Sequence, residues 1–415
     1  MKRIRNCVFL SLILIPHIAA AQRDAWVASW TAAPEPADPD PKEPLFNLED
    51  RTVRERVRLS IGGTQIRIRL SNEYGSSPLV VGAVTVGVPN DPATVMPGAI
   101  QAVTFGGQKS VTIPAGAPVL SDPVPFSAAY GSEITLSLYF PKRVATPTWH
   151  QLALKRAVVS PRGDHTHEER IRGGIETRKL LLASAVLVPA PLNQRLVVAF
   201  GDSLVDGDGA TPDADRNWPG DLIRRLGTIP GGGRLAVVNQ GIAGNRLLGD
   251  GPLASLGISA LARFDRDALA VPGVTHVLLL EGVNDIGFPG AKLDDLPLAD
   301  PGDLRSADQL IGAYRQLIAR AHARGIKLIC ATLTPFEGVD VPGYYSASKE
   351  ATRQAVNKWI RTSNEFDAVV DGDAVLRDPD HPSQLLPRFA SEDHLHPNDT
   401  GYQALADAID VSLFN

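Results

Sequence analysis

Two patterns of hydrophobic and polar residues divide the chain. In the first half, apolar residues recur at every second position, as in QIRIRLS, where Ile66, Ile68 and Leu70 alternate with polar side chains. Alternation of this kind predicts β-strands with one buried face. Gly- and Pro-containing turns separate such runs, and no long helical pattern interrupts them. The sequence therefore predicts an antiparallel, jelly-roll-like β-sandwich over residues 22–186.

The second pattern begins at Arg195. Short apolar runs such as RLVVAFG, RLAVVNQG and THVLLLEG alternate with stretches of helical period such as LIGAYRQLIARAHARG. Strands that are apolar on both faces and alternate with helices are typical of a parallel sheet covered by helices. We therefore expect an α/β domain over residues 195–415, joined to the sandwich by a proline-containing linker over residues 187–194.

Residues 1–21 have the features of a secretory signal peptide. A basic start precedes a short apolar stretch from Val8 to Ile15, and three alanines end at Ala21. Cleavage near Ala21 would leave a chain that begins at Gln22 and is secreted or periplasmic. The apolar stretch is too short to span a bilayer, so no membrane span is expected.

The net charge limits the class of partner, and the cysteine content limits the disulfides that can form. The formal net charge is −5 and becomes −8 when the three basic residues of the signal are removed, which disfavours nucleic acid as a partner. Cys7 lies inside the signal and Cys330 is the one remaining cysteine, so no intramolecular disulfide is expected. The apolar run KLICATL predicts that Cys330 is a buried strand residue.

Candidate catalytic residues follow the predicted parallel strands. Ser203 comes after VVAFG, Gly244 lies in VVNQGIAGNR, and Asn284 lies in LEGVND. The carboxyl ends of parallel strands border the ligand crevice of such a sheet. A serine nucleophile also needs a base and an orienting carboxylate, and SEDHLHPNDTGY offers Asp393 and His396 three residues apart.

His394 is a competing imidazole. Because it is adjacent to Asp393, the two side chains would diverge in an extended or turn segment, and we favour His396. The oxyanion-hole donors would be the backbone N–H groups of Ser203 and Gly244 and the side-chain amide of Asn284. Each of these residues alone has an ordinary structural explanation in a turn or loop, so the assignment depends on their combination.

Together these blocks resemble the SGNH, or GDSL-type, hydrolases. GDSL, NQGIAG, GVND and DHLH occur here in the order expected for that family. The resemblance implies a flavodoxin-like three-layer α/β fold and acyl transfer without a metal or other cofactor. It implies Ser203 as nucleophile, His396 as general base and Asp393 as its partner. Ser203, Gly244 and Asn284 would form the oxyanion hole.

The N-terminal half resembles a subgroup of exported SGNH esterases in which a β-sandwich precedes the catalytic domain. The similarity lies in WVASWTAAP, RTVRERVRLSIGG and RIRLSNEYG. It implies an acylated carbohydrate substrate, above all O-acetyl groups on xylan or its oligosaccharides. Trp149 and Tyr139 are possible carbohydrate platforms, although strand aromatics more often serve packing. The alternatives are a lipase or arylesterase acting on lipids or small esters, an inactive carbohydrate-binding relative, and acyl transfer to a sugar.

Two further polar clusters are better explained as surface loops than as metal sites. GDHTHEE has ligand residue types but no matching distant cluster. The aspartates that follow the nucleophile lack the Gly and the terminal Glu of a calcium loop; they are Asp206, Asp208, Asp213 and Asp215. Asp202 and Asp285 flank the candidate catalytic positions, and we expect them to brace loops by hydrogen bonds.

Overall fold

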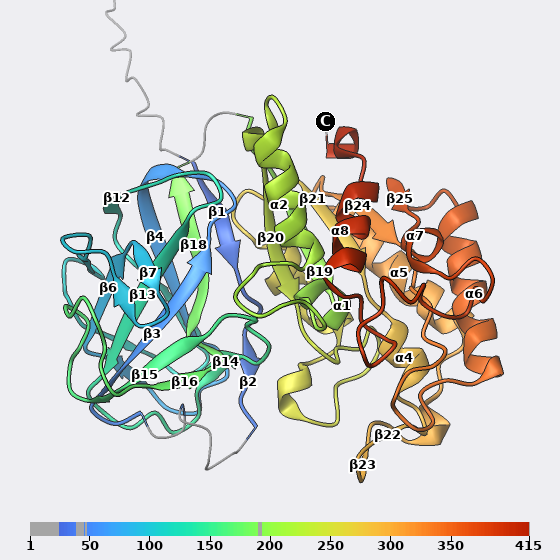
Figure 1. Ribbon diagram of the computed structural model, residues 1–415, viewed down its shortest axis with the longest axis horizontal. Coiled ribbons are helices and arrows are strands. Elements are labelled where there is room, and N and C mark those ends of the chain that lie inside the picture. Colours follow the sequence, from blue (N-terminus) through green and yellow to red (C-terminus); the bar gives the residue numbers. More distant parts are fainter. Residues whose placement is uncertain (1–24, 39–44, 46–47, 190–192, 415) are drawn as a thin grey trace, which may run out of the picture.

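The computed structural model describes residues 25–38, 45, 48–189 and 193–414, and the predicted signal peptide lies outside them. An antiparallel β-rich part and an α/β part lie side by side (Figure 1). The first ends with strand β18 (Ala183–Pro189) and the second begins with β19 (Arg195–Gly201). None of the helices among the described residues is long and apolar enough to cross a membrane.

Three antiparallel sheets make up most of the N-terminal part. The first has the order β1 (Trp26–Thr31), β18, β4 (Gly63–Asn72) and β11 (Ala117–Leu120), and β12 (Val124–Ala128) also pairs with β4. The second has the order β16 (Ile175–Thr177), β15 (Ala157–Arg162), β3 (Arg51–Arg58), β13 (Glu133–Phe140), β6 (Ala83–Gly87) and β9 (Gln101–Val103). The third contains β17 (Leu180–Leu181), β14 (Thr148–His150) and β2 (Glu35–Pro36). Two short pairs join β5 (Leu79–Val81) to β10 (Val111–Ile113) and β7 (Pro89–Asp91) to β8 (Thr94–Val95). The predicted antiparallel β-rich character is confirmed, and the packing of these sheets as a sandwich stays a prediction.

Strand β13 is buried on both faces, which its alternating sequence does not predict. Ser137 lies on the polar face but accepts a hydrogen bond from Arg54 Nε at 2.9 Å. Nη2 of Arg54 in turn donates to the carbonyl of Glu168 at 2.7 Å, and Thr85 donates to the carbonyl of Thr166 at 2.8 Å. The GDHTHEE segment therefore covers the polar face of this sheet, and its backbone carbonyls satisfy a buried arginine.

The linker predicted over residues 187–194 begins later than expected. Residues 187–189 belong to β18, where Val188 pairs with Val27 of β1 and is fully buried. The apolar alternation of β18 therefore continues to Pro189 at the strand end, where a proline is tolerated because no further ladder bond is needed. Residues 190–192 lie outside the described part of the chain.

The α/β part contains a five-stranded parallel sheet, as predicted. Its order is β20 (Leu235–Gly241), β19, β21 (His276–Leu280), β24 (Lys327–Ala331) and β25 (Ala368–Val370). This 2-1-3-4-5 order is flavodoxin-like. The helices are α1 (Ser203–Asp206), α2 (Trp218–Thr228), α3 (Ala260–Phe264), α4 (Val283–Gly287), α5 (Ala307–His322), α6 (Ala347–Thr362), α7 (Gly372–Leu376) and α8 (Asp399–Ala408).

Right-handed crossovers distribute these helices over the two faces of the sheet. The connection from β19 to β20 moves toward one edge of the sheet, whereas the later connections move toward the other edge. Helix α2 therefore lies on one face of the sheet, and α3, α5 and α6 lie on the other. Helix α2 packs against α8, and α5 packs against α3 and α6. Side chains of Ser306, Ser346 and Asn398 cap α5, α6 and α8 by accepting hydrogen bonds from backbone N–H groups of the first turn.

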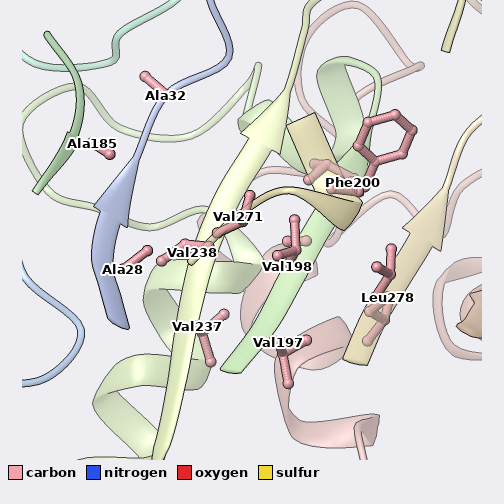
Figure 2. Close-up of a cluster of buried hydrophobic side chains, with 14 of the residues drawn as sticks. Ala28, Ala32, Ala185, Val197, Val198, Phe200, Val237, Val238, Val271 and Leu278 are labelled. Carbon is pink, nitrogen blue, oxygen red and sulfur yellow. The ribbon is translucent and has the colours of Figure 1, made fainter. Parts of the chain in front are cut away.

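A shared hydrophobic core joins the two parts. Figure 2 shows Ala28 of β1 beside Val238 of β20, with Val198 on the neighbouring strand β19. All three side chains are almost fully buried. Thr31 Oγ1 donates to the carbonyl of Asn239 at 2.7 Å across the same boundary. The N-terminal part therefore packs directly on the edge strand of the parallel sheet.

Candidate active site

Ser203 is the first residue of the short helix α1, directly after the carboxyl end of β19. The side chain of Asp202 caps this helix by accepting the N–H of Leu204 at 2.9 Å, which is the bracing role expected for it. A Cβ on Gly201 would lie 1.9 Å from the carbonyl of Leu280, so the close approach of β19 to β21 requires glycine there. The turn therefore brings Ser203 out at the edge of the sheet where ligand crevices form.

The structure brings Ser203, His396 and Asp393 into one hydrogen-bonded row. His396 Nε2 lies 2.8 Å from Ser203 Oγ, and His396 Nδ1 lies 2.5 Å from Asp393 Oδ2. The other oxygen of Asp393 accepts three hydrogen bonds, from Ser391 Oγ and from the N–H groups of Leu395 and His396. These bonds orient the carboxylate toward the imidazole, which is the geometry that an acid–base relay requires.

His394 points elsewhere. Its φ of +59° turns the backbone through the left-handed region between Asp393 and His396, and its side chain is exposed. The β-carbon of His394 lies near Gly338 rather than at Ser203. The tight turn thus separates the two imidazoles, and His396 is the one that reaches Ser203.

The electrostatic surroundings favour a protonatable His396 beside an ionised Asp393. Burial raises the pKa of Asp393, but the hydrogen bond and charge of His396 outweigh it and hold that pKa well below its ordinary value. Burial lowers the pKa of His396, but the hydrogen bond to Asp393 and the charge of Asp208 leave it above its ordinary value. Asp208 Oδ2 lies 3.9 Å from His396 Nε2. A protonated His396 is therefore stabilised from two sides, by Asp393 and by Asp208.

Two backbone donors lie free at this edge of the sheet. The N–H groups of Ser203 and Gly244 have no hydrogen-bond acceptor in the part of the chain that the structure describes. Gly244 has a φ of +74°, and a Cβ there would lie 2.7 Å from the side chain of Leu256. The positive φ therefore favours glycine at this position, and a side chain there would also have to displace Leu256.

The side-chain amide of Asn284 is held by two neighbours. Its Nδ2 donates to the carbonyl of Asn245 at 2.9 Å, and its Oδ1 accepts from the hydroxyl of Tyr344 at 2.8 Å. The carbonyl of Asn245 can only accept, so it fixes which end of the amide is nitrogen, and the Tyr344 hydroxyl therefore donates to the oxygen at the other end. One hydrogen of Nδ2 is left without an acceptor among the described residues. Nothing in the sequence pattern singles out Tyr344, which lies in a loop without periodicity.

Arg263 is a second residue that sequence reasoning missed. It is fully buried and donates to the carbonyl of Gly201 at 2.7 Å, to the carbonyl of Gln240 at 2.8 Å and to Asn245 Oδ1 at 2.8 Å. One guanidinium therefore ties the ends of β19 and β20 to the loop that follows Gly244. Asp285 braces the same loop by accepting from the N–H groups at residues 247 and 248, and burial raises the pKa of this carboxyl to about 6.

Other predicted candidates take structural positions. Two of the aspartates that follow the nucleophile reach across to the N-terminal part, where Asp213 pairs with Arg56 at 2.7 Å and Asp215 pairs with Lys155 at 2.7 Å. Trp149 is only 2% exposed, so of the two interpretations of this strand aromatic, packing holds and a carbohydrate platform does not. Cys330 is buried in β24, as expected. These residues hold the fold rather than contact a ligand.

One group among the described residues has metal-ligating atoms close together. Side chains of Glu35, His150 and Asp206 each offer an atom within 4.8 Å of the others, and all three are buried. The sequence does not predict this group, because its members lie in three separate segments of the chain.

Comparisons with known proteins concern the α/β part. The family model described as the GDSL-like lipase/acylhydrolase family matches residues 199–404. None of the proteins with curated functions matches the chain. Similar solved structures include a GDSL-like lipase from Bacteroides thetaiotaomicron (17% identity, TM-score 0.37, covering 53% of this chain and 88% of that one). A carbohydrate acetylesterase family member from Sinorhizobium meliloti has 14% identity and a TM-score of 0.40, covering 52% and 94%. An acetyl-xylooligosaccharide esterase from Geobacillus has 23% identity and a TM-score of 0.37, covering 52% and 91%.

Proposed function

Because residues 199–404 belong to the GDSL-like lipase/acylhydrolase family, we propose that the protein is a serine esterase that uses Ser203, His396 and Asp393. The observation that carries this proposal is the hydrogen-bonded row from Ser203 Oγ through the imidazole to the carboxylate. A serine hydroxyl becomes an effective nucleophile when an oriented base removes its proton.

The reaction would proceed in two acyl-transfer steps. Ser203 Oγ attacks the ester carbonyl carbon while His396 Nε2 takes the hydroxyl proton. The carbonyl oxygen becomes an oxyanion that accepts hydrogen bonds from the N–H groups of Ser203 and Gly244 and from Asn284 Nδ2. The C–O bond to the alcohol breaks as His396 returns its proton to the leaving oxygen. Water then attacks the acyl-enzyme by the same route and releases the acid and free Ser203.

We further propose that the substrate is an O-acetyl ester on a plant polysaccharide such as xylan, and that the protein acts after export. The N-terminal segments WVASWTAAP and RIRLSNEYG support this through their resemblance to exported esterases with a β-rich domain before the hydrolase. The basic and apolar start of the chain supports export. The formally acidic chain suits a neutral carbohydrate better than a polyanion.

Acetate release from acetylated xylan oligosaccharides tests this proposal. The wild-type protein is expected to release acetate, and Ser203→Ala to lose at least about a thousandfold in rate. Ser412→Ala is the matched control, because it removes the hydroxyl of an exposed serine that bonds to Asp410 and lies outside the row of Ser203, His396 and Asp393. An active Ser203→Ala protein would refute the serine mechanism. Cleavage of aryl esters without acetate release from xylan would keep the mechanism and refute the polysaccharide substrate.

A second candidate, an esterase for longer acyl chains, is favoured by an open cleft of about 600 Å³ beside the loop that follows Gly244. Arg246, Pro297 and Leu298 are among its lining residues. Large apolar side chains are exposed on neighbouring segments; they are Leu253, Leu293, Leu296 and Leu304. A series of p-nitrophenyl esters from acetate to decanoate decides between the two. A kcat/KM that falls with chain length supports the acetylesterase, and one that rises supports the longer-chain esterase.

A further inference from the structure

The N-terminal part reaches the candidate active site through one histidine. His150 ends strand β14, and its Nε2 lies 3.1 Å from Oδ1 of Asp206, the last residue of the helix that begins with Ser203. On the other side of the ring, His150 Nδ1 lies 3.0 Å from Glu35 Oε1 and 3.1 Å from the carbonyl of Ala33. The side chains of Glu35, His150 and Asp206 are 0%, 8% and 3% exposed, so water does not compete for these contacts.

Both ring nitrogens of His150 face acceptors, and this decides the charge of the ring. The carbonyl of Ala33 can only accept, so Nδ1 must carry a proton, and Nε2 also carries one when the Asp206 carboxyl is ionised. The ring is then an imidazolium between two carboxylates. Burial lowers the pKa of His150, but the charges and hydrogen bonds of Asp206 and Glu35 outweigh burial and raise it well above its ordinary value. Glu35 is held in turn, because its Oε2 accepts the N–H of Gln151 at 3.0 Å.

The same geometry disfavours a metal ion at this group. A metal would bind one unprotonated ring nitrogen and both carboxylates from a single point. Here the two nitrogens point away from each other, and each meets a different carboxylate. Both ring nitrogens are already engaged by protein atoms, Nδ1 with the carbonyl of Ala33 and Nε2 with Asp206, so neither is free to bind an ion.

Asp206 connects this cluster to the oxyanion-hole loop. Its Oδ2 accepts the backbone N–H of Ala243 at 3.1 Å, and Ala243 directly precedes Gly244. A Cβ on Gly241 would lie 2.3 Å from the backbone nitrogen of Asp206, so α1 packs tightly on the end of β20. The Asp206 carboxylate thus links the two parts of the molecule: its Oδ1 contacts His150, and its Oδ2 contacts the loop that contains Ala243.

We propose that His150 is a positioning residue for ester hydrolysis: it holds the Asp206 carboxylate so that the loop from Ala243 presents the Gly244 N–H to the oxyanion. This inference rests on the proposed function and adds a role for the N-terminal part, which supplies both His150 and its counter-ion Glu35. The reacting atoms are not touched by His150, so its effect passes through Asp206. To hold Asp206, residue 150 must place a hydrogen-bond donor where His150 Nε2 lies. A glutamine side chain can supply such a donor, and an alanine side chain cannot.

The experiment compares full-length wild type with His150→Ala and His150→Gln. Hydrolysis of p-nitrophenyl acetate is expected to lose at least about tenfold in kcat in His150→Ala, with KM within about twofold, because loss of a whole oxyanion donor costs about a hundredfold or more. His150→Gln is expected to recover most of kcat. Hydrogen exchange of the segment 239–248 is expected to speed up in His150→Ala, because the Ala243 N–H loses its fixed acceptor.

Lys155→Met is the matched control. Lys155 lies at the same boundary, where it pairs with Glu133 at 2.8 Å and Asp215 at 2.7 Å, and neither partner contacts the loop from Ala243. This variant is expected to lower Tm but to leave kcat and the exchange of segment 239–248 unchanged.

Three outcomes would overturn the inference. The first is a His150→Ala protein with wild-type kcat and exchange, and the second is an equal loss of kcat in His150→Ala and Lys155→Met. The third is a chelator-induced fall in Tm that His150→Ala abolishes, which would make the cluster a metal site. A wild type that hydrolyses no ester would refute the proposed function instead, and the exchange measurement would still decide whether His150 positions the loop.

Discussion

Asp393→Asn separates the electrostatic role of this residue from its structural one. Oδ1 of Asp393 accepts three donors, from Ser391 and from the N–H groups of Leu395 and His396. An asparagine must keep its oxygen at that position, because an NH2 group would face three other donors. Its nitrogen therefore takes the place of Oδ2 and points at His396 Nδ1.

This exchange reverses the tautomer of the imidazole. Nδ1 of His396 would have to accept from the asparagine, so the ring proton moves to Nε2 and Ser203 loses its base. The corresponding change in a Ser-His-Asp triad lowers kcat about 10⁴-fold, which is about 5 kcal/mol of activation free energy. The fold loses much less, about 1–2 kcal/mol, because the hydrogen bonds remain and only their charge assistance is lost.

Steady-state kinetics and thermal unfolding together test this reasoning. We expect kcat to collapse while Tm falls by a few degrees. Glu392→Gln, which neutralises the adjacent exposed carboxylate, should change neither quantity. The pH dependence of the residual activity should also shift in a defined direction. Asp393 helps to raise the pKa of His396, and the neutral base exists above that pKa, so the acid limb of the pH profile should move to lower pH in Asp393→Asn. A variant that keeps kcat within tenfold, or whose acid limb moves to higher pH, would refute the relay.

Two further variants test the oxyanion donors. Tyr344→Phe removes the hydroxyl that fixes the Asn284 amide, so kcat is expected to fall about tenfold with KM unchanged; full activity would mean that Asn245 alone holds the amide. Gly244→Ala places a Cβ at positive φ and 2.7 Å from Leu256, so it should cost at least about 1–2 kcal/mol of stability and about a hundredfold in kcat. Gly312→Ala is its control, because nothing lies within 4 Å of the added carbon, and it should stabilise helix α5 by about 0.5–1 kcal/mol; similar losses in both variants would argue against a specific role for Gly244.

Local patterns predicted the parallel sheet and its helices well. The strand at residues 195–201 and the caps at Ser306, Ser346 and Asn398 follow from residues that are close together in the chain. The same locality explains why Asp393 and His396 could be paired, since a tight turn joins them. Periodicity and capping act over a few residues, and that is the range in which the sequence alone was sufficient.

Long-range packing is what the sequence could not supply. Tyr344 and Asn284 are separated by 60 residues, and only the folded chain brings hydroxyl and amide together. The sequence left open whether Trp149 packs in the core or binds sugar, and only the folded chain, in which β14 lies between β17 and β2, shows its side chain buried. Ser137 reads as a solvent-facing residue, yet a loop covers it. For Ser137 the alternating pattern predicts the strand but not the segment that packs on its second face.

The dependence of the hydrolase site on the N-terminal part follows from the same kind of contact. Asp206 is buried only three residues after Ser203, and a buried carboxylate is costly unless a partner compensates its charge. Here that partner is His150, which comes from the other part of the molecule. Without the N-terminal part, Asp206 would be free to turn toward water and to release Ala243. The two parts therefore share one polar network as well as one hydrophobic core, and the geometry of the oxyanion loop depends on both.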